Sequence, residues 1–188
     1  MNTAQFRALQ APLKERYRRD PNAAMKTMRA TGWTSADLAF TVETHNGPVE
    51  TGLHPSAGGD GSLASGEEML LEALVACSGV TLQAVAAALG IELREARILA
   101  EGDLDVRGTL SLAKEVPVGF RAIRLQFELD SDAPDEKLDR LIELTERYCV
   151  VLQSLRQPPE IAVTRAQLAG QAAGEQFGST ASSGGYDI

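Results

Sequence analysis

Hydrophobic and polar residues alternate along several short stretches of the chain, and this alternation predicts β-strands. The first two stretches, residues 38–42 and 49–53, flank an Asn46-Gly47 pair. Because both residues tolerate positive φ, the pair suits a tight turn and predicts a β-hairpin. Residues 93–106 and 123–129 predict two further strands, the second with the clearest alternation in the chain.

The run of residues 66–89 contains no proline and is typical of a helix. Ser65 followed by Glu68 predicts a capping box at its start, and Gly90 predicts its end. Apolar residues lie nearly all round this helix: Met69, Leu70, Leu71, Leu74, Val75, Val80, Leu82, Val85 and Leu89. A helix of this kind is expected in the interior, covered by sheet or by a partner subunit.

A second amphipathic helix is predicted to open at Asp132 and Pro134 and to run toward Cys149. Leu138, Leu141, Ile142 and Leu144 carry its helical spacing. Pro158 ends a following short helical piece, and residues 161–163 are expected to add a last strand. These elements predict an α+β fold, an antiparallel sheet wrapped against two central helices.

The two ends of the chain differ from the middle. Residues 3–29 favour helix interrupted at Pro12 and Pro21, and we interpret residues 1–31 as a helical N-terminal arm. The folded domain is predicted over residues 32–168. Beyond it, residues 169–188 are rich in Gly, Ala, Ser, Gln and Thr and are predicted to form a flexible tail.

Composition and charge limit the classes of function. With 188 residues and 44% hydrophobic content, the chain can bury one core. Its net charge of −8 argues against nucleic acid and anionic lipid as partners. The N-terminus does not resemble a signal peptide, and we expect no stretch apolar enough for a membrane span. The sequence therefore predicts a soluble, cytoplasmic protein with no membrane partner.

Several common sites lack their sequence signals. Cys77-Ser78-Gly79-Val80 is not a Cys-x-x-Cys motif, and the two histidines lack zinc-ligand spacing. The glycine-rich stretch of residues 58–61 lacks the ending of a phosphate-binding loop. We expect neither a metal nor an organic cofactor.

The two cysteines are the remaining candidates for chemistry, one on each predicted helix. Cys77 lies about three turns into the apolar helix and Cys149 at the end of the second. Each could simply be a small buried hydrophobe, because free cysteine is among the most buried residue types. For catalysis, the thiol would need its thiolate form, which burial disfavours, so a nearby cation is expected.

The segments around both cysteines resemble the OsmC and organic hydroperoxide resistance family. The similarity lies in Glu67-Glu68-Met69-Leu70-Leu71-Glu72-Ala73-Leu74-Val75-Ala76-Cys77, in Val116-Pro117-Val118-Gly119-Phe120 and in Glu146-Arg147-Tyr148-Cys149. It covers roughly residues 38–163. The resemblance implies an intertwined homodimer with its active sites at the subunit interface. It also implies that Cys77 reduces hydroperoxides, preferring organic ones, that Cys149 resolves the oxidised product, and that an external dithiol restores both thiols.

By the same resemblance, Glu67 matches the family glutamate that holds an activating arginine. Ten residues of helix span about 15 Å, so Glu67 cannot reach Cys77 along one helix. Either the helix begins later, or the site is shared across the dimer. Glu67 could also serve only the helix dipole.

The family's arginine motif has no match here, where residues 32–37 read Gly-Trp-Thr-Ser-Ala-Asp. Arg29 and His54 are possible substitutes, although a plain surface role suits each of them. The absence of this arginine motif leaves a second hypothesis open. The chain could be a non-enzymatic member of the fold that binds a hydrophobic small molecule in its dimer cleft.

Overall fold

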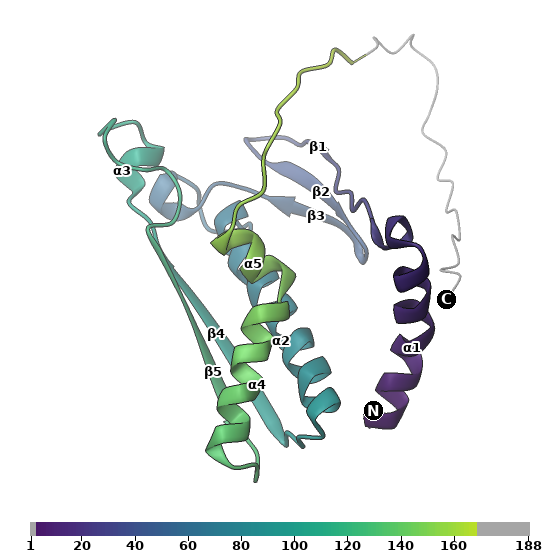
Figure 1. Ribbon diagram of the computed structural model, residues 1–188. Coiled ribbons are helices and arrows are strands. Elements are labelled where there is room, and N and C mark those ends of the chain that lie inside the picture. The colour runs from purple at the N-terminus through teal and green to yellow at the C-terminus, as the bar shows by residue number, and fades with distance from the viewer. Residues whose placement is uncertain (1–2, 169–188) are drawn as a thin grey trace. The chain divides into compact units, whose positions relative to one another are not determined.

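The computed structural model of the chain describes residues 3–168 and contains helices and two antiparallel sheets (Figure 1). The predicted α+β class is confirmed. In chain order the longer elements are α1 (Thr3–Arg19), β1 (Gly32–Thr34), β2 (Phe40–Thr44), β3 (Gly47–Thr51), α2 (Gly66–Leu89), β4 (Glu95–Asp103), β5 (Ala122–Asp130), α4 (Asp135–Tyr148) and α5 (Val150–Arg156). Short helical turns lie at η1 (Pro21–Ala24), η2 (Pro55–Ala57) and α3 (Val106–Thr109).

The first sheet has the strand order β1-β2-β3 and contains the predicted hairpin. Val42 pairs with Val49 and Thr44 with Gly47, so the turn falls at residues 45 and 46, one residue before the predicted Asn46-Gly47 pair. Gly47 has a φ of 107°, a conformation that glycine adopts without steric cost. The prediction that Leu38 begins the strand is wrong: its φ is 64°, which is incompatible with an extended strand. Strand β1, which the alternation did not predict, extends the hairpin to three strands.

Helix α2 has the boundaries that its caps predicted. The Ser65 hydroxyl accepts from the backbone N–H of Glu68, and the Glu68 carboxylate accepts from the backbone N–H of Ser65. At the other end Gly90 has a φ of 69°, and its N–H donates to carbonyls of the last turn. These bonds satisfy backbone groups that a helix terminus leaves unpaired. The helix is therefore continuous from Gly66 past Cys77.

The core lies where α2 meets α4 and the β4-β5 sheet. Its buried members are Leu82, Val85, Ala86, Ile91 and Leu141, and apolar residues of both strands and of α4 pack around them. Leu82 and Leu141 are essentially free of solvent contact. Burial of one such side chain stabilises the fold by about 1.5–3 kcal/mol. Helix α2 therefore packs against the β4-β5 sheet, as predicted, and also against α4.

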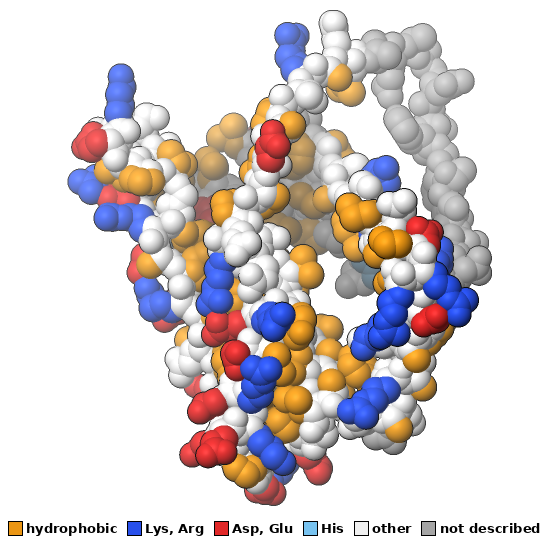
Figure 2. All heavy atoms as spheres, in the orientation of Figure 1, with side chains coloured by type: hydrophobic (Ala, Val, Ile, Leu, Met, Phe, Trp, Pro, Cys, Tyr) orange, Lys and Arg blue, Asp and Glu red, His pale blue; other side chains and the backbone are white. Residues whose placement is uncertain are grey.

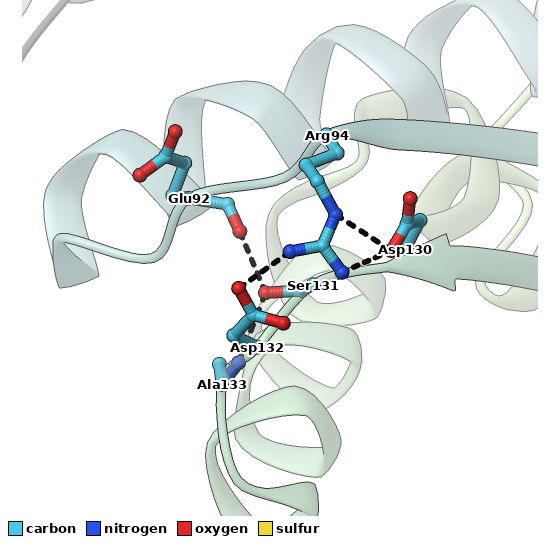
Figure 3. A network of polar contacts seen from close by, with 6 residues as sticks. All are labelled: Glu92, Arg94, Asp130, Ser131, Asp132 and Ala133. Carbon is cyan, nitrogen blue, oxygen red and sulfur yellow. Dashed lines mark hydrogen bonds and ion pairs between the residues drawn. The ribbon is translucent and has the colours of Figure 1, made fainter.

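A polar network joins the start of β4 to the turn between β5 and α4 (Figure 3). The guanidinium of Arg94 donates to Asp130 and to Asp132, and the Ser131 hydroxyl donates to the carbonyl of Glu92 at 2.6 Å. The Arg94 hydrogen bond holds the pKa of Asp130 below its usual value. The network fixes the strand register at the end where α4 begins.

Much of α2 remains exposed in the single chain. By length and composition this helix could cross a membrane, so the expectation that no stretch is apolar enough is wrong. A soluble core helix passes the same test, and only 28% of this stretch is buried within the chain. Figure 2 shows hydrophobic side chains gathered on the surface over α2 and α4. Val80 is 73% exposed and Tyr148 57%.

The N-terminal residues form a longer helix than predicted. Helix α1 runs through Pro12, so the predicted interruption there is wrong, whereas Pro21 does open a new turn at η1. A proline's missing N–H costs one intrahelical hydrogen bond, and the rest of the helix remains intact. Helix α1 packs against α2. The division into an arm of residues 1–31 and a domain of residues 32–168 stays a prediction.

Contacts divide the chain into two compact units, the first of which is Met1–Pro158. The described part of the second, residues 159–168, contains no helix or strand, so the last strand predicted there is not observed. Strand β4 also ends earlier than predicted, at Asp103, because the chain turns into α3. The predicted flexible tail, residues 169–188, lies outside the described residues.

Candidate active site around Cys77 and Cys149

The two cysteines lie close together at the junction of α4 and α5, one within α2 and the other at the junction itself. Cys77 lies in α2 and is half-buried, whereas Cys149 is fully buried and is the single residue between α4 and α5. The N–H of Cys149 donates to Thr145 in α4, and its carbonyl accepts from Gln153 in α5. Cys149 therefore ends one helix and begins the next. Both sulfurs are free thiols.

The surroundings of Cys77 lower the pKa of its thiol. Partial burial, the largest single influence, raises the pKa, but four hydrogen bonds together outweigh it. In order of size, the donors are the backbone N–H of Val151, the thiol of Cys149, the backbone N–H of Val150 and the hydroxyl of Thr81. Hydrogen bonds to the charged form of an acid favour that form. The thiolate of Cys77 is therefore stabilised at the start of α5.

These donors carry no formal charge, although the sequence predicted a cation beside the thiol. We expected a cation to favour the thiolate, and the two backbone amides at the start of α5 lower the pKa instead. Amides at the first turn of a helix are not used within the helix and point outward along its axis. The short turn at Cys149 brings them to Cys77.

The thiol of Cys149 lies beside the hydroxyl of Ser78. Ser78 Oγ lies 3.4 Å from Cys149 Sγ, within hydrogen-bonding distance for sulfur, and both residues are fully buried. Neither Ser78 nor Thr81 was predicted as a site residue from the sequence. The signal was present, because Thr81 follows Cys77 by one helical turn and residues four apart share a helix face.

The structure does not bring Glu67 to Cys77 within the chain. Glu67 is half-buried in the first turn of α2, and Cys77 lies ten residues further along the same continuous helix. That separation corresponds to about 15 Å along the axis. The possibility that the helix begins after Glu67 is therefore wrong, which leaves a site shared between subunits or a role in the helix dipole.

Arg29 and His54, the possible substitutes for the missing arginine, do not lie beside Cys77 in the chain. Arg29 is exposed in the segment that precedes β1. His54 Nδ1 accepts from the backbone N–H of Ser56, and its Nε2 lies 4.0 Å from the Glu68 carboxylate. His54 is therefore engaged beside the start of α2, three turns before Cys77.

Two cavities flank the helices that carry the cysteines. The first, about 590 Å³, lies between α2, α5 and β5; among its lining residues are Leu70, Leu74, Phe120, Ile123, Leu152 and Leu155. The second, about 570 Å³, lies between α1, α2 and α4 and includes Phe6, Lys14, Thr81 and Tyr148. Since Thr81 also contacts Cys77, the second cavity borders the residue that donates to the thiol.

Metal-ligating side chains do not gather in the part of the chain that the structure describes. Among residues 3–168, no three or more His, Cys, Asp or Glu side chains lie together as a metal site would require. What the arrangement offers is thiol chemistry: an accessible thiol of lowered pKa beside a second, buried thiol. Such a pair can alternate between two thiols and a disulfide.

The sequence of this chain matches a known protein family over the region that contains both cysteines. Residues 59–164, more than half of the chain, match the OsmC-like protein family. No curated protein matches the sequence.

Several solved structures have a similar fold. The OsmC-like protein of Mycoplasma pneumoniae is 19% identical, with a TM-score of 0.60 over 71% of this chain and 89% of that one. An organic hydroperoxide resistance protein of Elizabethkingia anophelis is 20% identical, with a TM-score of 0.57 over 71% and 93%. The organic hydroperoxide resistance protein OsmC of Legionella pneumophila is 18% identical, with a TM-score of 0.55 over 71% and 91%. Identities this low establish a common fold.

Proposed function

Because the chain belongs to the OsmC-like protein family, we propose that it is a thiol-dependent peroxidase that reduces organic hydroperoxides. Family membership indicates a redox role in resistance to peroxides. The proposal assigns the attack on peroxide to Cys77 and the resolution of the oxidised product to Cys149. The observation that carries it is the position of Cys149 beside Cys77 at the junction of α4 and α5, where the Cys149 thiol helps to lower the pKa of Cys77.

The proposed reaction has two steps on the protein. The Cys77 thiolate attacks one peroxide oxygen, the O–O bond breaks, and the organic fragment leaves as an alcohol after protonation. Cys77 is then a sulfenic acid. The Cys149 thiolate attacks its sulfur, water leaves, and an intrachain disulfide forms. An external dithiol supplies the two electrons that restore both thiols, and no metal or organic cofactor takes part.

The positions of the two thiols suit these roles. Cys77 is half-buried and can meet a substrate, whereas Cys149 is fully buried and can meet only its neighbours. The cavity bordered by Thr81 is large enough for an organic peroxide, and its walls are largely apolar. A reducing cytoplasm, which we propose as the location, would return the pair to free thiols between turnovers.

We further propose a homodimer. In the single chain, Val80 and other apolar residues of α2 are exposed, and so are Trp33 and Phe40 of the first sheet. Apolar surface of this extent on a helix and a sheet favours burial against another subunit. A dimer could also bring Glu67 of one subunit within range of Cys77 of the other, which one chain cannot do.

Peroxide consumption by the purified protein tests the proposed function. With cumene hydroperoxide and dithiothreitol, we expect turnover by the wild type, none by Cys77→Ser, and loss of the intrachain disulfide in Cys149→Ser. Mass spectrometry after peroxide treatment detects that disulfide directly. Equal inertness of the wild type and Cys77→Ser would refute the peroxidase.

The cavity between α2, α5 and β5 favours a second candidate, the binding of a hydrophobic small molecule without catalysis. Its volume of about 590 Å³ is in the range of small-molecule sites, and leucines from two helices line it. A fluorescent apolar probe distinguishes the candidates. Saturable binding by a protein that consumes no peroxide would favour the non-enzymatic function.

A further inference from the structure

We propose that Ser78 is a positioning residue for the resolving step, in which its hydroxyl donates to the sulfur of Cys149 as this sulfur attacks oxidised Cys77. The inference rests on the roles proposed above for the two cysteines. It assigns a task to a buried hydroxyl that no step of the reaction otherwise uses.

The inference rests on a buried contact between the side chains of Ser78 and Cys149. Ser78 Oγ and Cys149 Sγ are 3.4 Å apart, and neither residue is exposed to solvent. Ser78 belongs to the buried stripe of α2 together with Leu74 and Leu82, at a spacing of four residues. Ser78 and Cys149 thus meet where the buried face of α2 packs against the junction of α4 and α5.

Chemistry determines which of the two atoms must donate during the attack. Between a neutral thiol and a hydroxyl, either group can be the donor. A thiolate has no proton and can only accept, so the hydroxyl of Ser78 must donate once Cys149 ionises. Because a buried thiolate has lost its water, one hydrogen bond to it counts for more than at the surface.

Helix α2 carries two hydroxyl groups near the thiols, and each of them lies beside a different cysteine. The hydroxyl of Thr81 helps to lower the pKa of Cys77, and Ser78 Oγ lies within hydrogen-bonding distance of Cys149 Sγ. Loss of the Thr81 hydroxyl should therefore affect the first step, and loss of the Ser78 hydroxyl the second. A role for Ser78 in packing alone would not separate the steps in this way.

A disulfide reagent tests the inference without peroxide. Cys77 attacks 2,2′-dithiodipyridine, releases one thiopyridone and keeps the other as a mixed disulfide; Cys149 then attacks that disulfide and releases the second. Absorbance of thiopyridone resolves the two phases, and Cys149→Ser should show only the first. The resolving attack is thus measured even if the protein consumes no peroxide.

For Ser78→Ala we expect an unchanged first phase and a second phase slowed about tenfold at neutral pH. The slowing should be confined to the second phase, because only the thiolate of Cys149 has lost its donor. Ser78→Thr keeps a hydroxyl and should restore much of the rate. Ser154→Ala, which removes an exposed serine of α5, should behave as the wild type and is the matched control.

Each other outcome counts against the inference. A second phase as fast as in the wild type over the whole pH range would overturn it, and so would equal slowing of both phases, which indicates structural damage. A wild type that releases one thiopyridone would also overturn it, since Cys149 would then not attack Cys77. If instead the predicted phases appear and no peroxide is consumed, only the proposed peroxidase fails.

Discussion

The thiol of Cys149 lies beside that of Cys77 and helps to lower its pKa, although the two residues are far apart in the sequence, one within α2 and the other between α4 and α5. The contact depends on the turn at Cys149, which ends α4 and begins α5 at a single residue. That turn also directs the backbone amides of Val150 and Val151 toward Cys77. One local feature of the backbone thus supplies both the partner thiol and the donors that favour the thiolate.

The first prediction concerns the pH dependence of Cys77. Its pKa lies below the ordinary thiol value of 9.0, so thiolate forms at lower pH than in an unfolded chain. The rate of alkylation of Cys77 by iodoacetamide, localised by mass spectrometry, should be half-maximal below pH 9.0. In denaturant the midpoint should return toward this value. A midpoint at or above it in the folded protein would contradict the hydrogen-bonding scheme.

The same shift affects stability. An acid with a lowered pKa in the folded state stabilises the fold above its unfolded pKa. This contribution is lost as the pH falls through the folded pKa. The free energy of unfolding should therefore depend on pH in the alkaline range less strongly in Cys77→Ser than in the wild type.

The second prediction concerns Thr81. Thr81→Val keeps the shape of the side chain and removes the hydroxyl that donates to Cys77, so the pKa of Cys77 should rise. Loss of one hydrogen bond predicts alkylation roughly threefold slower at neutral pH. The rate at high pH, where all of the thiol is ionised, should stay the same. Thr109→Val, at an exposed threonine of α3, is the control and should change neither rate.

Local signals were sufficient to predict the elements that position the site. The Ser65-Glu68 capping box and Gly90 gave both ends of α2, and alternation gave the hairpin and strands β4 and β5. These features depend on near neighbours in the sequence. Helix α1 was predicted less well, because Pro12 suggests a break that the surrounding helix tolerates.

The activation of Cys77 could not be predicted in the same way. Its donors at Val150 and Val151 are backbone amides, which every residue except proline carries, so their residue types give no signal. Their effect arises from the turn at Cys149 and from the packing of α5 against α2. The sequence therefore predicted a charged side chain beside Cys77, whereas main-chain amides lower the pKa of its thiol in the structure.

The third prediction concerns the capping box at the start of α2, the helix that carries Cys77. Ser65→Ala removes the acceptor for the Glu68 N–H and the hydroxyl that donates to its carboxylate. The loss of a cap of this kind costs about 1 kcal/mol. Denaturation by urea should show a lower midpoint with an unchanged slope. Glu72→Ala, at an exposed position of the same helix, should leave the midpoint close to that of the wild type.

The fourth prediction decides the role of Glu67, which one continuous helix holds about 15 Å from its own Cys77. If the site is shared between subunits, Glu67 of one chain acts on Cys77 of the other. Cys77→Ser has no attacking thiol, and Glu67→Gln has no carboxylate, so each variant alone should consume peroxide slowly or not at all. A mixed dimer contains one site in which Cys77 of the Glu67→Gln subunit meets the intact Glu67 of the Cys77→Ser subunit. Mixing the variants under conditions that exchange subunits should therefore restore activity, up to one working site per mixed dimer.

A site within one chain predicts the opposite result. The remaining Cys77 of the mixed dimer belongs to the Glu67→Gln subunit, whose own chain has no carboxylate at that position to serve the thiol. Activity would then stay at the mean of the two variants, and Glu67 would be limited to the helix dipole. Tagged copies purified in tandem establish that mixed dimers formed. Mixing Cys77→Ser with Glu72→Ala, which keeps Glu67, measures the rate of one unimpaired thiol per dimer.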